Sequence, residues 1–183
     1  MRFLKWCVVL LAGLLTACAA ATGGNPPAPP DDITIQEVHT KYEWYGWGSR
    51  GYTLDVTCEG ESCTAASTCS ASLSAEEGDV VTNAPVEVPA ATVNALRVIL
   101  AGAQPVDEPQ EVIEHTDDYP NSQITLITSE GESLLVTSTS NSANNIPWNL
   151  QRDGQWYVHN NEAFPTAYGA LLESVNATEC WGF

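Results

Sequence analysis

One strictly alternating segment constrains the fold of this 183-residue chain more than any other feature. From Tyr52 to Cys58, apolar side chains occupy every second position, which is the period of a half-buried β-strand. Residues 59–62 read Glu-Gly-Glu-Ser, a turn that would place Cys58 opposite Cys63 and within disulfide reach. The segment therefore predicts an antiparallel hairpin whose second strand covers about residues 63–72.

Other segments extend this pattern to a whole domain. A further strand is expected from Ile33 toward Trp44, followed by a Gly-rich loop over residues 46–51. Two more hairpins are predicted, and Asp153-Gly154 is the strongest turn signal among them. Their strands are expected at residues 123–128 with 133–138, and at residues 148–150 with 155–158.

Two segments have the period of a helix. Near residues 89–101, Pro89 suits the first helical position and Gly102 can cap the end. Residues 164–175 form the second, with Phe164 and Leu171 able to face inward. The fold class that follows is α+β. It is an antiparallel sheet of about five to seven strands with two helices packed on one face.

The first 18 residues indicate export. Arg2 and Lys5 precede an uncharged run of about ten residues, too short to cross a ~30 Å hydrocarbon core. The following Leu15-Thr16-Ala17-Cys18 resembles the lipobox of bacterial lipoproteins. That resemblance implies cleavage before Cys18 and attachment of a diacylglycerol to its sulfur, so the membrane is a partner through a lipid anchor. An ordinary cleaved signal with an incidental cysteine is the alternative.

The resemblance also organises the chain and its location. Residues 1–17 would be the signal peptide, residues 18–32 the lipidated cysteine with a Pro- and Gly-rich tether, and residues 33–183 a single globular domain. Ala19 after the cysteine implies the outer membrane in a cell with two membranes. In a cell with one membrane, the anchor would lie in the outer face of the plasma membrane.

Four cysteines remain in the expected globular domain: Cys58, Cys63, Cys69 and Cys180. An even number in an exported domain favours two disulfides, and three connectivities are open. The hairpin favours Cys58–Cys63, which leaves Cys69–Cys180. A four-cysteine zinc site is the alternative, but the spacings fit it poorly.

Charge and motifs exclude several functions. The formal net charge of −17 repels phosphate backbones, so nucleic acid is not expected as a partner. Neither a phosphate-binding loop nor a recognised nucleophile or metalloprotease motif occurs, so no catalytic residue, metal or cofactor is assigned. His115 with Asp117 and Asp118 could contribute to a metal site, although acidic loop residues are more often simply solvated.

A cluster of aromatic residues is the candidate surface for a ligand or a protein partner. Its members are Tyr42, Trp44, Tyr45, Trp47 and Tyr52, together with Arg50. Core packing is one use of this cluster, and stacking on sugar rings or anchoring a protein partner is the other. The leading hypothesis is a non-enzymatic binding, assembly or structural module of the cell envelope. The alternative is a glycan- or peptidoglycan-binding domain that uses the Tyr42–Tyr52 region. A hydrolase whose residues converge only in the fold is the third.

Overall fold

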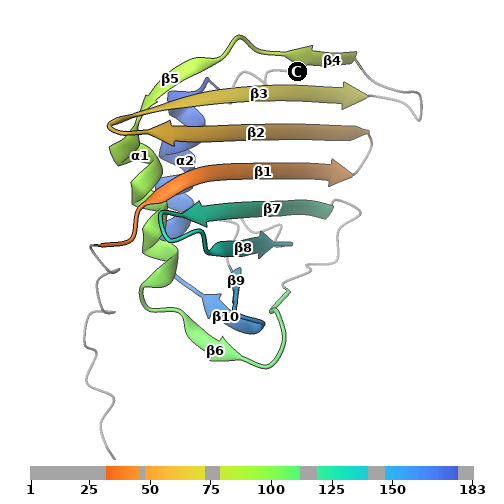
Figure 1. Ribbon diagram of the computed structural model, residues 1–183. Helices are drawn as coiled ribbons and strands as arrows, with labels where there is room; N and C mark the ends of the chain where they lie inside the picture. The colour runs from red at the N-terminus through yellow and green to blue at the C-terminus, as the bar shows by residue number, and fades with distance from the viewer. Residues whose placement is uncertain (1–31, 46–47, 73–78, 112–118, 140–146, 177–183) are drawn as a thin grey trace, which may run out of the picture.

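The computed structural model describes residues 32–45, 48–72, 79–111, 119–139 and 147–176. Its main feature is one antiparallel sheet of ten strands, with two helical segments behind it (Figure 1). The α+β class is therefore confirmed in outline, while the expected five to seven strands were too few. In the part of the chain just delimited, no helix is long and apolar enough to cross a membrane.

The strand order is β4-β3-β2-β1-β7-β8-β9-β10-β6, and β5 pairs with β3 beside β4. The three predicted hairpins are all present, and the long central strands β1, β2, β3 and β7 make most of the sheet (Figure 1). The strands are β1 (Ile35–Tyr45), β2 (Ser49–Glu59), β3 (Ser62–Ser72), β4 (Asp79–Thr82), β5 (Val86–Pro89), β6 (Gln104–Val106), β7 (Tyr119–Thr128), β8 (Ser133–Ser138), β9 (Trp148–Arg152) and β10 (Gln155–His159).

The helices cover one face of the sheet, as expected (Figure 1). α2 (Ala163–Ser174) matches the second predicted helix closely. The first is different, because α1 (Ala90–Asn94) is a single α-turn that continues as a 3-10 helix, η1 (Ala95–Leu100). Its buried residues Leu96 and Ile99 are three positions apart, which is the period of a 3-10 helix.

Two segments contain strands that the sequence did not predict. The predicted loop over residues 46–51 is shorter, because β2 begins at Ser49 and includes Gly51. Gly51 lies opposite Ser70, whose Oγ would be 2.6 Å from a Cβ added there, so a larger residue at position 51 would require the Ser70 side chain to rotate. β6 and the start of β7 lie between residues 104 and 121, where no element was predicted.

The hairpin disulfide is present. Cys58 and Cys63 are bonded, with a Cα–Cα distance of 3.9 Å, at the turn between β2 and β3. Cys69 is also disulfide-bonded. Its predicted partner, Cys180, lies outside the described residues, as does Cys18, so the second pairing stays a prediction.

The N-terminal end of the domain is fixed to the helical layer. The Ile35 amide donates to Asn94 Oδ1 over 2.7 Å, and Arg97 Nη1 donates to the Ile33 carbonyl over 2.9 Å. Both helical partners lie at the end of the sheet where β1 begins (Figure 1). A tether leading into residue 33 would therefore join the domain at this end.

Candidate functional site

On the face of the sheet toward the helices, the side chains change along the strands from apolar to hydroxyl-bearing. Near the start of β1, this face is apolar and fully buried, with Val38, Val56 and Leu126 at 0% exposure. Four residues further along β1, a row of hydroxyl-bearing side chains crosses the same face. Tyr42 is the register partner of both Tyr52 and Ser122, and Ser122 pairs in turn with Ser138.

A pocket of about 320 Å³ lies where this row meets α2. This volume is at the lower end of the range for small-molecule sites. We call it the aromatic pocket, because four of its eight lining residues are tyrosine or tryptophan. They come from β1, β2, β7, β9 and α2: Tyr42, Tyr52, Ser122, Trp148, Pro165, Tyr168, Gly169 and Leu172.

Trp148 joins the strand side of the pocket to the helix side. Its ring contacts Phe164 and Tyr168 of α2 edge to face, with centroid separations of 5.0 and 5.9 Å. The residue before it is held by a hydrogen bond from the Ser138 hydroxyl to the Pro147 carbonyl, 3.0 Å long. The position of Trp148 is therefore fixed by both the sheet and the helix.

Two buried polar groups of the lining lack a partner among the described residues. They are the Tyr52 hydroxyl and the indole Nε1–H of Trp148, in residues only 3% and 1% exposed. Leaving such a group without a hydrogen bond costs about 1–3 kcal/mol, so each needs an explanation. An indole N–H can only donate, whereas a phenol can donate or accept.

None of the described residues that line the pocket carries a formal charge. Burial raises the pKa of Tyr42, Tyr52 and Tyr168 above the ordinary value for a phenol. All three are therefore neutral hydroxyls at any physiological pH. Among the described residues, no carboxylate or imidazole lines the pocket.

One cation lies in the next row of the sheet. Arg50 pairs in register with Trp44, and its guanidinium lies 5.6 Å from the centroid of that ring. Its charge lowers the pKa of Tyr42, against the larger effect of burial. The positive charge of Arg50 therefore lies close enough to Tyr42 to affect its hydroxyl, although the whole chain is strongly acidic.

The structure brings together four of the six predicted surface residues. Tyr42 and Tyr52 line the pocket, and Trp44 and Arg50 follow in the neighbouring row, half-buried. The side chain of Tyr45 and all of Trp47 lie outside the described residues. Sequence reasoning missed the contribution of Trp148 and α2, whose approach to β1 no local pattern indicates.

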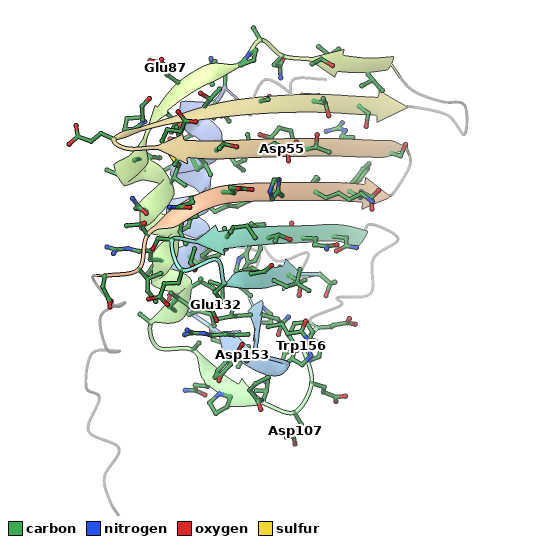
Figure 2. All side chains as sticks on the ribbon, viewed as in Figure 1. Asp55, Glu87, Asp107, Glu132, Asp153 and Trp156 are labelled. Atoms are coloured by element: carbon green, nitrogen blue, oxygen red, sulfur yellow. A yellow bond between two sulfur atoms is a disulfide. The ribbon has the colours of Figure 1, made fainter. Side chains whose placement is uncertain are left out.

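The histidines lie elsewhere. His39 is on the opposite, open face of the sheet, with Nδ1 2.7 Å from Asp55 and Nε2 3.2 Å from Glu37 (Figure 2 shows Asp55 on this face). His159 is fully buried, with Nε2 2.9 Å from the Ala101 carbonyl. The suggested metal cluster at His115 lies outside the described residues. Within those that are described, no group of three or more His, Cys, Asp or Glu side chains could hold a metal ion.

Comparisons of the chain with family models, curated proteins and solved structures found no match. Any functional conclusion therefore depends on the chemistry of the pocket.

Proposed function

We propose that this protein is a non-enzymatic binding module of the cell envelope, anchored through a lipidated Cys18, and that the aromatic pocket is its ligand site. The observation that carries the proposal is the pocket itself, a cavity of about 320 Å³ with four aromatic side chains in its described lining. A concave, mostly apolar surface with a few hydroxyl groups is typical of a small-molecule site.

The lining supports binding rather than catalysis. Its hydroxyls belong to serine and to tyrosines whose raised pKa values keep them protonated, and they have no base beside them in the lining. A nucleophilic hydroxyl needs an adjacent base to activate it. Small-molecule sites are typically apolar with a few placed polar groups, which describes this pocket.

The position of the pocket is compatible with an anchored module. Ile33, where the tether would join, is held beside η1, whereas Tyr42 is near the other end of β1. Seven residues of extended strand between Ile35 and Tyr42 span about 24 Å. The pocket would therefore be well separated from the point of attachment.

Phenol is a suitable first probe, because it has an apolar ring and an oxygen that can accept a hydrogen bond. In the full chain, purified in a detergent that has neither an aromatic nor a sugar headgroup, millimolar phenol should shift NMR signals of the pocket residues. Gly169→Phe should abolish the shifts, since a Cβ at Gly169 meets no atom within 4 Å and the added ring can fill the pocket. Ala170→Phe is the matched control, because Ala170 is exposed on the same helix.

The phenol experiment has two informative failures. If phenol shifts no pocket signal in the wild-type protein, the pocket is not a ligand site. If Gly169→Phe and Ala170→Phe respond alike, the probe binds elsewhere, and the proposal fails in the same way.

A further inference from the structure

The outer edge of β4 is open in the part of the sheet that the structure describes. β4 is the terminal strand, so it pairs with β3 on one side and with no described strand on the other. Among the described residues, the large apolar side chains that are exposed both belong to β4, Val80 at 65% and Val81 at 52%. We infer that this edge is a docking site for an extended, positively charged segment of a partner protein, which adds a strand to the sheet. The inference goes beyond the pocket and does not depend on it.

The backbone of β4 presents hydrogen-bonding groups along this edge. The Asn83 amide donates to the Ser67 carbonyl over 3.0 Å, which continues the ladder between β3 and β4 by one residue pair. Bonded and non-bonded pairs alternate in an antiparallel ladder, so Val81 is the next residue whose N–H and C=O face β3. The N–H and C=O groups of Val80 and Thr82 therefore point outward. They offer two donors and two acceptors to a further strand.

The other edge strands have features that hinder strand addition. β6, at the opposite end of the sheet, has three residues, and its central residue Pro105 has no N–H to donate. The Val106 carbonyl already accepts from the Gln155 side chain over 2.8 Å. β5 follows Pro85 and ends at Pro89. In contrast, β4 contains neither proline nor lysine, two residues that commonly protect an edge strand.

Charge determines which segment fits this edge. The sequence has no lysine or arginine between Arg50 and Arg97, a stretch that includes β4 and its neighbours β3 and β5. Glu87 of β5 is exposed, and its side chain points outward at this edge of the sheet (Figure 2). A strand flanked by lysine or arginine is therefore attracted to the edge, and an acidic strand is repelled. The acidic residues of the stretch are Asp55, Glu59, Glu61, Glu76, Glu77, Asp79 and Glu87.

A second copy of this chain fits the edge less well. Each copy has a formal net charge of −17, so pairing through β4 would bring two acidic stretches together. The four residues of β4 offer about 13 Å of edge. A stable protein interface buries about 1,200–2,000 Å², more than one short strand provides. A short segment bound by strand addition needs less area, because backbone hydrogen bonds supply its affinity.

The test measures hydrogen exchange of individual amides by NMR, on the full chain in an uncharged detergent. The probe is the peptide KKVTVTVKK with blocked ends, and its control is EEVTVTVEE. In the free protein, the outward amides of Val80 and Thr82 should exchange quickly and the Val81 amide slowly. At about ten times its dissociation constant, the lysine peptide should slow exchange of the two outward amides about tenfold. The glutamate peptide should bind at least about tenfold more weakly at low salt.

Two pairs of variants locate the binding. Thr82→Pro removes an outward N–H and keeps the ladder to β3, so it should weaken binding of the lysine peptide about fivefold, the effect of one hydrogen bond. Thr82→Val keeps that N–H and should bind as the wild type does. Val80→Lys should also weaken binding, whereas Gln123→Lys, which adds the same charge on exposed β7, should not. Slow exchange of the Val81 amide shows that each variant retains the pairing of β4.

Each contrary outcome overturns the inference. Slow exchange at Val80 and Thr82 in the free protein would show that the edge is already covered, and no binding of the lysine peptide would show that it accepts no strand. A dimer in sedimentation velocity that Thr82→Pro dissociates would make a second copy the occupant. Equal affinity for the two peptides would remove the role of charge, and equal binding by Thr82→Pro and Thr82→Val would place the peptide elsewhere. The phenol experiment reports on the aromatic pocket alone, so the two failures are distinguishable.

Discussion

Tyr52→Phe is the most direct test of the unpartnered hydroxyl in the aromatic pocket. The substitution removes one oxygen and keeps the ring, which lies on the sheet face toward the helices at 3% exposure. A buried hydroxyl without a hydrogen bond destabilises the folded state by about 1–3 kcal/mol, and phenylalanine has no such group. We take the lower end, because the pocket is open on one side. The free energy of unfolding should therefore rise by about 1 kcal/mol, which raises the Tm by about 3 °C for a domain of this size.

Urea titration with the disulfides kept oxidised measures this change, and the slope m should be the same in both proteins. Tyr157→Phe is the matched control. Tyr157 is half-buried in β10, away from the pocket lining, and should change stability by less than about 0.5 kcal/mol. A clear loss of stability in Tyr52→Phe would show that the hydroxyl has a partner in the folded protein. That result would contradict the unpartnered state of the Tyr52 hydroxyl.

Three further predictions concern other parts of the chain. Gly169→Ala should raise the free energy of unfolding by about 0.5–1 kcal/mol in urea titration, because Gly169 lies inside α2 with open space around its Cα; a loss would show that the helix needs glycine there. The hydrogen bond to Asp55, and secondarily that to Glu37, raises the pKa of His39 in the folded state. Its stabilising contribution is complete below about pH 6.5 and disappears as the pH rises through the raised pKa. The stability difference between the wild type and His39→Gln should thus be larger at pH 5 than at pH 8, and a constant difference would contradict the ion pair. Palmitate labelling in a bacterial host should be lost in Cys18→Ala, and equal labelling would contradict the anchor.

Local patterns were sufficient to predict the centre of the sheet. β2 and β3 follow from the alternation between Tyr52 and Cys58 and from one turn, and the disulfide at that turn is where the spacing placed it. The strands that were missed, β4, β5 and β6, have three or four residues each and lie beside the longer ones. Such segments are too short to show a period, so only their pairing with a neighbour defines them.

The pocket was predictable only on its strand side. Tyr42 and Tyr52 belong to one aromatic cluster in sequence, and alternation in their two strands puts both on the face that α2 approaches. Trp148 is 106 positions from Tyr42, and it joins them through β9 and the packing of Phe164. No local sequence pattern indicates that contact. The sequence therefore predicted the aromatic cluster but not the pocket.

The apolar core and the pocket lie at different positions along the same strands. This arrangement explains how a strongly acidic protein can contain a pocket whose described lining is uncharged. At the start of β1, Val38 lies under the helices and provides apolar packing that can tolerate unpartnered groups elsewhere. Further along the same strand, Tyr42 begins a row of hydroxyls beside one arginine that lies over Trp44, and no described residue of the pocket lining is acidic. The exposed side chains of His39 and Asp55 lie on the opposite face, because neighbouring positions of a strand alternate between faces. Alternation therefore keeps these charged groups of β1 and β2 out of the described pocket lining.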